Sequence, residues 1–459
     1  MNLFFLSYQA WTSQIIIFHD SIGYENLAGM FLRGEWKEYF LTGPSREPAY
    51  SLLIACSMSI AQWLHTNHLD VQIMLQVAIL TVTQILMYKL LKKLQISDVT
   101  CALILLYMGL SPALTSSGLI LFSEIITYPI VLWLILALSH AWSQFQTASL
   151  QRNIINAFSF VLPALLITFT KAAFELIIPT LLLPFIWKSY LAYKERLQKT
   201  VLNSLIFIAA VICTFEGPII AYKMVNLHCN GIYALTDRGP EALYGNTLRR
   251  MAPLSGDRLK SVLAYMTGAD VCARLYKDRC EYWGYGESDL IGANKMNEMR
   301  SKGIPREVRN KICIRESIQT ILRNPLQYLF LSGVESAKIL FWESPPKVYY
   351  AVTLDFFENI YNSPWLRFPL RFAMAFICIW AMGSSAIRVW KKRKRIFDTH
   401  QISDDHSTAL LTLLAIAAFG LFHSFFLILP RYSLVVAPLF LALVAWQFDS
   451  RKTKKTITS

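Results

Sequence analysis

The sequence predicts an all-α polytopic membrane protein with about ten transmembrane helices, interfacial helices and an external loop domain. Composition is the first observation. Of 459 residues, 54% are hydrophobic and 16% are charged, and the mean hydropathy is +0.40. Second, apolar runs long enough to span a bilayer recur along the chain. Third, Lys and Arg gather in blocks at the ends of such runs, as the positive-inside tendency predicts.

The predicted spans are apolar runs of roughly 17 to 25 residues. In chain order they cover residues 2–18, 71–91, 99–117, 119–140, 154–170, 172–190, 202–225, 366–390, 408–429 and 432–448. The run 49–64 is shorter and contains several serines, so we expect an interfacial or re-entrant helix there. Helical patterns at 305–322 and 327–342 lie in the longest polar segment, and the second is apolar enough to be interfacial.

The basic blocks set the predicted orientation. If 391–395 and 451–455 are cytoplasmic, counting spans backwards also places 188–199 and 89–93 in the cytoplasm. Both termini are then cytoplasmic. Because the blocks act as topology signals, membrane lipids are expected partners and nucleic acid is not.

The same count divides the chain into three parts. Residues 1–225 form an N-terminal transmembrane module whose external segment, 19–68, carries the catalytic loop. Residues 226–365 form an external, periplasmic loop domain, and 366–459 contain the C-terminal transmembrane helices. The first run lacks a basic n-region and a small-residue cleavage site, so no cleavable signal peptide is predicted. We expect an integral protein of the bacterial inner membrane.

The eight cysteines fall into two groups. Four lie in apolar runs, where a thiol behaves as a small core hydrophobe: Cys56, Cys101, Cys213 and Cys378. Four share the long polar segment: Cys229, Cys272, Cys280 and Cys313. We expect these to form two disulfides in an oxidising compartment, with the pairing left open. Zinc is the alternative, but neither a CxxC motif nor paired histidines accompany them.

Charged residues collect at the predicted external edge of the membrane, contributed by segments far apart in the sequence. The acidic residues are Asp20, Glu25, Glu47 and Glu124, and the basic residues are Arg46, Lys171 and Arg431. Charges at membrane depth are costly, so each needs a partner or a function. Together they supply the groups for acid and base chemistry on a phosphate-bearing lipid.

Structural alternatives exist for the residues of the first external segment. Asp20 and Glu25, with Tyr24 between them, are solvated loop residues in the alternative interpretation. Glu47 would cap the helix that begins at Pro48 and pair locally with Arg46.

The later charged residues have structural alternatives too. Glu124, expected about one turn into its span, would form a structural ion pair. Lys171 and Glu175, four residues apart, would neutralise each other on one helix face. Arg431 lies outside against the charge rule, so a phosphate or lipid headgroup is a plausible partner.

Several well-known catalytic motifs are absent from the sequence. No Walker A loop, GxSxG, HExxH or DxD element occurs. This speaks against ATP-driven transport, serine hydrolysis and zinc proteolysis as leading functions. No cofactor is expected, and the sequence gives no indication of a divalent metal.

A series of short motifs covers roughly the first 190 positions and the last spans: Asp20-Ser-Ile-Gly-Tyr24, the segment 26–34, Arg46-Glu-Pro-Ala-Tyr-Ser-Leu-Leu53, Leu110-Ser-Pro-Ala113, Ser123-Glu124, Thr170-Lys171 and Arg431-Tyr432. The order of these motifs resembles the GT-C superfamily of polyprenyl-phosphate-sugar-dependent glycosyltransferases, which includes lipid A aminoarabinose transferase and protein O-mannosyltransferases. Residues 226–365 match no family we can name.

The resemblance implies roles for these residues. Asp20 would be the general base and Glu124 a second acidic residue of the site. Substrate-binding roles would fall to Tyr24, Glu25, Arg46, Glu47, Lys171, Arg431 and Tyr432. Lys171 stands where related sequences usually have Arg, and Asp20-Ser21-Ile22 lacks the paired acidic motif of metal-using members.

The sequence therefore predicts a membrane glycosyltransferase that moves a sugar from a polyprenyl-phosphate donor to a lipid, glycan or protein acceptor on the external face. Two alternatives stay open. One is a polymerase or ligase for a lipid-linked polysaccharide, and the other is a transporter of lipid-linked oligosaccharides. A transporter typically carries repeats or broken helices at mid-membrane, whereas the charges here cluster at one edge.

Overall fold

The computed structural model describes residues 15, 17, 20–43, 45–144, 149–276, 280, 285–343, 363–397, 405–426 and 430–457. Within these residues the regular structure is entirely helical, and no strand occurs. In the same residues, seven helices are long and apolar enough to cross a membrane, or eight if a bent pair is one span. The prediction of an all-α polytopic protein is confirmed at this level, and the count of about ten spans stays a prediction.

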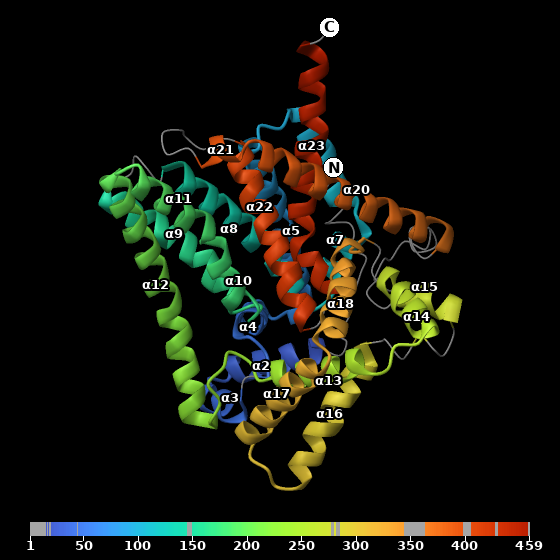
Figure 1. The fold of residues 1–459 in the computed structure, drawn as a ribbon. Helices are drawn as coiled ribbons and strands as arrows, with labels where there is room; N and C mark the ends of the chain where they lie inside the picture. Colours follow the sequence, from blue (N-terminus) through green and yellow to red (C-terminus); the bar gives the residue numbers. More distant parts are fainter. Residues whose placement is uncertain are drawn as a thin grey trace.

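The spanning helices agree closely with the apolar runs of the sequence. In chain order they are α5 (His68–Lys93), α8 (Glu124–Gln144), α10 and α11 (Phe174–Leu181 and Leu183–Lys194), α12 (Gln198–Asn230), α20 (Pro364–Lys391), α22 (Asp405–Phe425) and α23 (Ala437–Ile457), which follows the 3₁₀ turn η5 (Pro430–Val436). Figure 1 shows α5, α8, α22 and α23 lying together in the middle of the bundle.

Three of the predicted spans are not among the seven unbroken spanning helices. The run 99–117 forms α6 (Asp98–Leu110) and α7 (Pro112–Ser116) with a bend of 61° between the two arms. The break falls before Pro112, which has no N–H to donate and disfavours a helical residue ahead of it. The run 154–170 forms α9 (Leu150–Thr168), which is not one of the seven. The run 2–18 lies outside the described residues except at 15 and 17.

The segment 19–68, which was predicted to be external, is helical over most of its described residues and not only at 49–64. It contains α2 (Asp20–Leu32), α3 (Trp36–Thr42) and α4 (Pro48–Leu64). Pro48 occupies the first turn of α4, as predicted, and α4 has the expected short length of 17 residues. Helices α2 and α4 pack against each other, with the rings of Tyr24 and Tyr50 at right angles 5.1 Å apart.

The long polar segment folds into a set of helices, called the helical layer, that lies beneath one end of the bundle and along one side of it (Figure 1). Its helices are α13 (Arg238–Met251), α14 (Gly256–Thr267), α15 (Ala269–Tyr276), α16 (Tyr285–Ser301), α17 (Arg306–Arg323), α18 (Pro325–Ser336) and the 3₁₀ turn η3 (Ala337–Leu340). The helices expected at 305–322 and 327–342 are present as α17 and as α18 with η3. Helices α13 and α16 cross closely at Gly245, where a Cβ atom would lie 1.9 Å from the Ser288 carbonyl oxygen.

One disulfide joins Cys272 to Cys280. The expectation of a second is wrong in this structure, because Cys229 and Cys313 are free thiols. Cys229 belongs to α12, whereas Cys313 is buried in α17 with its Sγ 4.0 Å from the Met296 Sδ. The two thiols therefore lie in different packing environments and do not meet.

Helix α12 is the longest helix of the described chain, with 33 residues. At about 1.5 Å per residue it is roughly 50 Å long. Its final turns leave the bundle and reach α3 (Figure 1). There the Tyr222 and Tyr39 hydroxyls lie 2.6 Å apart, and the Asn230 side chain donates to the Phe40 carbonyl at 2.8 Å.

The two ends of the bundle differ in the residues they carry. The short basic helix α21 (Arg393–Ile396) lies at one end, and α2, α3 and α13 lie at the other (Figure 1). The acidic and basic residues that the sequence singled out are near α2, at the end opposite this basic block. The orientation predicted by counting spans from the basic blocks requires this separation, and which end is cytoplasmic stays a prediction.

Candidate functional site

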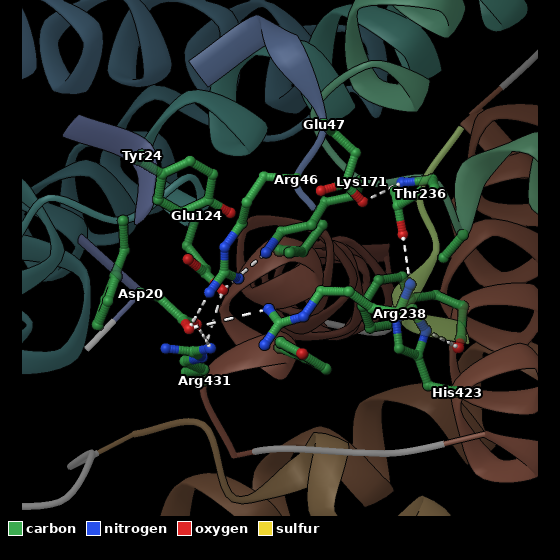
Figure 2. Close-up of a pocket in the computed structure, with 16 residues that line it drawn as sticks. Asp20, Tyr24, Arg46, Glu47, Glu124, Lys171, Thr236, Arg238, His423 and Arg431 are labelled. Atoms are coloured by element: carbon green, nitrogen blue, oxygen red, sulfur yellow. Dashed lines mark hydrogen bonds and ion pairs between the residues drawn. The ribbon is translucent and has the colours of Figure 1, made fainter. Parts of the chain in front are cut away.

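A cavity of about 160 Å³ lies where the helical layer meets the bundle. Figure 2 shows charged side chains from widely separated segments pointing into it. Its lining residues are Asp20, Tyr24, Arg46, Glu47, Phe122, Glu124, Lys171, Ala172, Ala173, Thr236, Arg238, Phe419, His423, Arg431, Tyr432 and Val435.

Asp20, the first residue of α2, lies among three guanidinium groups. Its Oδ1 accepts from Arg46 Nη2 and its Oδ2 accepts from Arg431 Nη2. Arg238 Nη1 lies 3.9 Å from Oδ1. Burial favours the neutral acid, but the charges of Arg431 and Arg46 outweigh it and hold the pKa of Asp20 well below its usual range. The carboxylate is therefore ionised at neutral pH.

Glu124 forms the second charged pair of the cavity. It begins α8 and is only 3% exposed. Lys171 Nζ donates to its Oε1 at 2.9 Å, and Arg431 Nε lies 3.8 Å from the same oxygen. Arg431 thus contacts both acidic residues and joins the two halves of the site.

Aromatic rings flank the cations of the cavity. Arg46 lies 5.1 Å from the ring centre of Tyr24, and Lys171 lies 5.1 Å from that of Tyr432. Arg431 lies 4.7 Å from the ring centre of Phe122. Cation–π contacts of this kind hold a positive group without neutralising it. The rings therefore hold in place the same cations that pair with Asp20 and Glu124.

The segments carrying these residues are tied to one another. Glu47 Oε1 accepts from the Ala172 backbone N–H at 2.8 Å, and the Ala49 N–H donates to the Phe169 carbonyl at 3.0 Å. The Tyr24 hydroxyl lies 3.0 Å from the Ser123 Oγ. These bonds tie the start of α4 to the turn between α9 and α10, and they tie α2 to the residue before α8.

The helical layer holds the end of α22 from below. Arg250 Nη1 donates to the Phe425 carbonyl at 3.1 Å, and Tyr328 donates to the same oxygen. Asn246 Nδ2 donates to the Phe426 carbonyl at 2.6 Å. The last carbonyl groups of a helix lack intrahelical partners, and these three hydrogen bonds supply them. The same bonds fix the position of the chain a few residues before Arg431.

A buried ionic cluster of Glu335, Arg249, Arg250 and Lys338 lies next to these hydrogen bonds. Glu335 is 1% exposed and accepts hydrogen bonds from Arg249 and Arg250. Lys338 Nζ lies 3.6 Å from it. Burial favours the neutral acid, but the charges of Arg249, Lys338 and Arg250 hold the pKa of Glu335 well below its usual range.

Eight of the nine site residues predicted from sequence line the cavity. They are Asp20, Tyr24, Arg46, Glu47, Glu124, Lys171, Arg431 and Tyr432. The exception is Glu25, which pairs with His68 at 2.9 Å outside the lining. The local ion pair expected between Arg46 and Glu47 is replaced by the contacts of Arg46 with Asp20 and of Glu47 with Ala172.

Two details of the expected charge arrangement are wrong. Lys171 and Glu175 do not neutralise each other, because α10 begins only at Phe174 and Lys171 precedes it. Lys171 pairs with Glu124 instead, and Glu175 pairs with Lys223 of α12. Glu124 is also not one turn inside its helix but begins it. Its carboxylate therefore lies near the positive end of the α8 dipole.

The sequence argument missed Arg238, Thr236 and His423. Arg238 lies at the start of α13 with a half-exposed side chain, in a segment that has no apolar run to place it at the membrane. His423 is buried in α22, and its Nδ1 lies 3.0 Å from the Phe419 carbonyl. The one sequence signal that α22 borders the site is that Arg431 follows the end of this helix by a few residues.

Within the described part of the chain, no three His, Cys, Asp or Glu side chains form a group that could hold a metal ion. The comparisons with known proteins add no relative to this description. No protein-family model matches the chain, and a search of curated proteins finds no match. The structure itself establishes the coarser class, an all-α membrane protein with a charged cavity at one end of its helical bundle.

Proposed function

We propose that this protein is a membrane glycosyltransferase that uses a polyprenyl-phosphate-linked sugar as donor. The observation that carries the proposal is the cavity in which Asp20 and Glu124 meet Arg46, Lys171 and Arg431. These residues come from the first 171 positions of the chain and from the turn before its last helix, so the fold gathers two carboxylates and three cations in one cavity. Such a set suits a reaction in which a phosphate leaves and a hydroxyl loses a proton.

In the proposed reaction, the acidic and the basic residues have different roles. Asp20 takes the proton from an acceptor hydroxyl or amine, and the resulting nucleophile attacks the anomeric carbon with inversion. The bond between that carbon and the phosphate oxygen breaks, and its electrons stay on the phosphate. Arg431, Arg46 and Lys171 stabilise the charge that grows on this leaving group, because guanidinium and ammonium groups donate to phosphate oxygens.

The geometry favours an enzyme over a transporter. A transporter of lipid-linked sugars needs access from both sides and typically has broken helices at mid-membrane. Here α2 and α13, which contribute to the charged cavity, lie at the end of the bundle opposite the basic helix α21 (Figure 1). A larger apolar pocket beside α21, lined by Arg393 and Phe397 among others, shares no residue with the charged cavity. Among the described residues, α6 and α7 are the bent helix pair that could together form one broken span. Its residues do not line the cavity.

A reconstituted assay tests the proposal. The purified protein is placed in liposomes with a polyprenyl-phosphate sugar and candidate acceptors, and product is measured by mass spectrometry. Asp20→Asn should lower turnover by roughly 10²–10⁴-fold, the usual contribution of a general base. The matched control is Glu38→Gln, which removes an exposed carboxylate from α3. Undiminished transfer by Asp20→Asn would remove Asp20 from the mechanism. Candidate acceptors come from comparing surface glycans of wild-type and deletion strains.

A further inference from the structure

The Asp20 carboxylate lies close to three guanidinium groups, which is more than one ion pair requires. Arg46 and Arg431 each occupy one oxygen of Asp20, and Arg238 lies 3.9 Å from Oδ1. A structural ion pair needs one cation per carboxylate. As the first residue of α2, Asp20 also has the positive end of a helix dipole beside it. Helix stability therefore does not account for three arginines.

The three arginines come from separate parts of the fold. Arg46 precedes α4, Arg238 begins α13 in the helical layer, and Arg431 lies in η5 between the last two spans. Guanidinium groups converging on two oxygens make the arrangement by which proteins hold phosphate. The cavity beside Asp20, about 160 Å³, leaves room for an oxyanion next to these groups.

We propose that Arg46, Arg238 and Arg431 form one phosphate site that the Asp20 carboxylate occupies in the absence of ligand, and that a polyprenyl phosphate displaces Asp20 from it. This deepens the proposed function and rests on it for the role of Asp20 as base. It also adds Arg238, a residue of the helical layer, to the binding site.

Displacement resolves a difficulty in the mechanism. A carboxylate that holds its negative charge against three cations is a weak base, because accepting a proton means giving up those contacts. Once a phosphate takes over the guanidinium groups, Asp20 loses its stabilising partners and becomes a stronger base. The base is thus activated only when donor is present, so donor binds productively before acceptor.

The charge count matches the reaction. A sugar linked through phosphate to a polyprenol carries one negative charge as a diester. The released monoester carries roughly −1.5 to −2 at pH 7. Of the charged side chains that line the cavity, Arg46, Lys171, Arg238 and Arg431 exceed Asp20, Glu47 and Glu124 by one positive charge. Asp20 loses its own negative charge when it takes the acceptor proton, so two positive charges then face the released monoester.

Ligand binding distinguishes this proposal from a purely catalytic or purely structural Asp20. The probe is farnesyl phosphate, a short polyprenyl monophosphate, titrated into detergent-purified protein while intrinsic Trp fluorescence is recorded. Asp20→Asn should bind it about tenfold more tightly than wild type, equivalent to about 1.4 kcal/mol. Farnesol, which has no phosphate, should show no difference between the two proteins.

Matched variants complete the test. Arg238→Ala should bind farnesyl phosphate several-fold more weakly than wild type, whereas Arg323→Ala, at an exposed position in the same layer, should bind equally well. Glu38→Gln controls for loss of any negative charge near α2. Because Asp20 begins a helix, Asp20→Ser keeps an oxygen for its N-terminus and is the second variant if Asp20→Asn does not fold.

Unchanged or weaker binding of farnesyl phosphate by a folded Asp20→Asn or Asp20→Ser protein would overturn the displacement proposal. The two proposals fail in different ways. If no sugar is transferred but the Asp20 variants bind more tightly, the glycosyltransferase assignment is wrong and the phosphate site stands. If sugar is transferred while the affinities do not change, the displacement step is wrong and the enzyme assignment stands.

Discussion

Arg431 and Asp20 are 411 positions apart in the chain and form an ion pair inside the cavity. The pair joins the first described helix to the turn between the last two spans. It places a residue expected to bind phosphate in contact with the residue expected to act as base.

The first prediction concerns Arg431. Arg431→Lys keeps the charge but loses the two-pronged donor geometry, so the affinity for farnesyl phosphate should fall roughly tenfold. Arg431→Ala should weaken it further. Equilibrium binding measures both, with Arg323→Ala as the control. Equal affinities of wild type and Arg431→Ala would remove this residue from the phosphate site.

The second prediction concerns the buried cluster beneath α22. Glu335→Gln leaves Arg249 and Arg250 without their shared carboxylate, and breaking a buried pair in this way costs about 3–5 kcal/mol. The exposed pair of Glu298 with Lys302 provides the control, because Glu298→Gln should leave the free energy of unfolding almost unchanged. Denaturant unfolding in detergent measures both, and similar losses would contradict a supporting role for the cluster.

The third prediction is a dependence of stability on pH. Burial lowers the pKa of Lys338 to about 8, below its ordinary value of 10.5, despite the opposing charge of Glu335. Between these pH values the unfolded chain binds the extra proton, so the contribution of Lys338 to stability rises with pH from about 8 to 10.5. Nearby charges are those of Glu335, Arg249 and Arg250, and the Tyr265 ring packs on the ammonium.

Lys338→Met tests this assignment because it keeps an unbranched side chain without the charge. Melting temperatures of wild type and variant, measured from pH 7 to 10.5, should converge as pH rises, because only the wild type gains stability by losing the Lys338 proton. Parallel curves would show that another group is responsible.

The fourth prediction concerns orientation. The parity argument puts the cavity end outside, so cysteines introduced at the exposed positions Ser45 and Ser301 should react with an impermeant maleimide in intact cells. A cysteine at Lys392, beside α21, should react only after permeabilisation. The parent protein measures the background from native thiols, including exposed Cys56 and Cys213. The reverse pattern would place the cavity in the cytoplasm.

The fifth prediction concerns thiols. Peptide mapping of non-reduced, promptly alkylated protein should recover Cys272 linked to Cys280, with Cys229 and Cys313 alkylated. A link between Cys229 and Cys313 would contradict the packing of α17. The bridge closes a short loop, for which removal typically costs about 2–3 kcal/mol, so Cys272→Ser should lower the melting temperature.

The helices of the bundle were predictable because hydropathy alone specifies them. The run 71–91 became α5 and the run 366–390 became α20, each with slightly wider bounds. Exact ends depend on local capping, which a hydropathy pattern does not contain. The break before Pro112 had a sequence signal, since a proline follows Ser111, but nothing in the pattern gave its angle.

The candidate site was predictable from the cost of charge near lipid, which drew attention to Asp20, Glu124 and Arg431. Which charges pair with which was not predictable. Lys171 was matched to Glu175 by helical spacing, but a helix start at Phe174 sends Lys171 to Glu124 instead. Arg238 sits in a polar segment where a cation is unremarkable, and only tertiary packing brings it to the cavity.

The length of helix α12 bears on the proposed function. A helix of roughly 50 Å exceeds the approximately 30 Å hydrocarbon core of a bilayer by about 20 Å. Its far end is bonded to α3 through Tyr222 and Asn230, so the length of α12 sets the distance of α3 from the bundle. For the proposed transferase, shortening α12 by whole turns would bring α3 closer to the bundle in steps of about 5.4 Å and would change the size of acceptor that can reach the cavity.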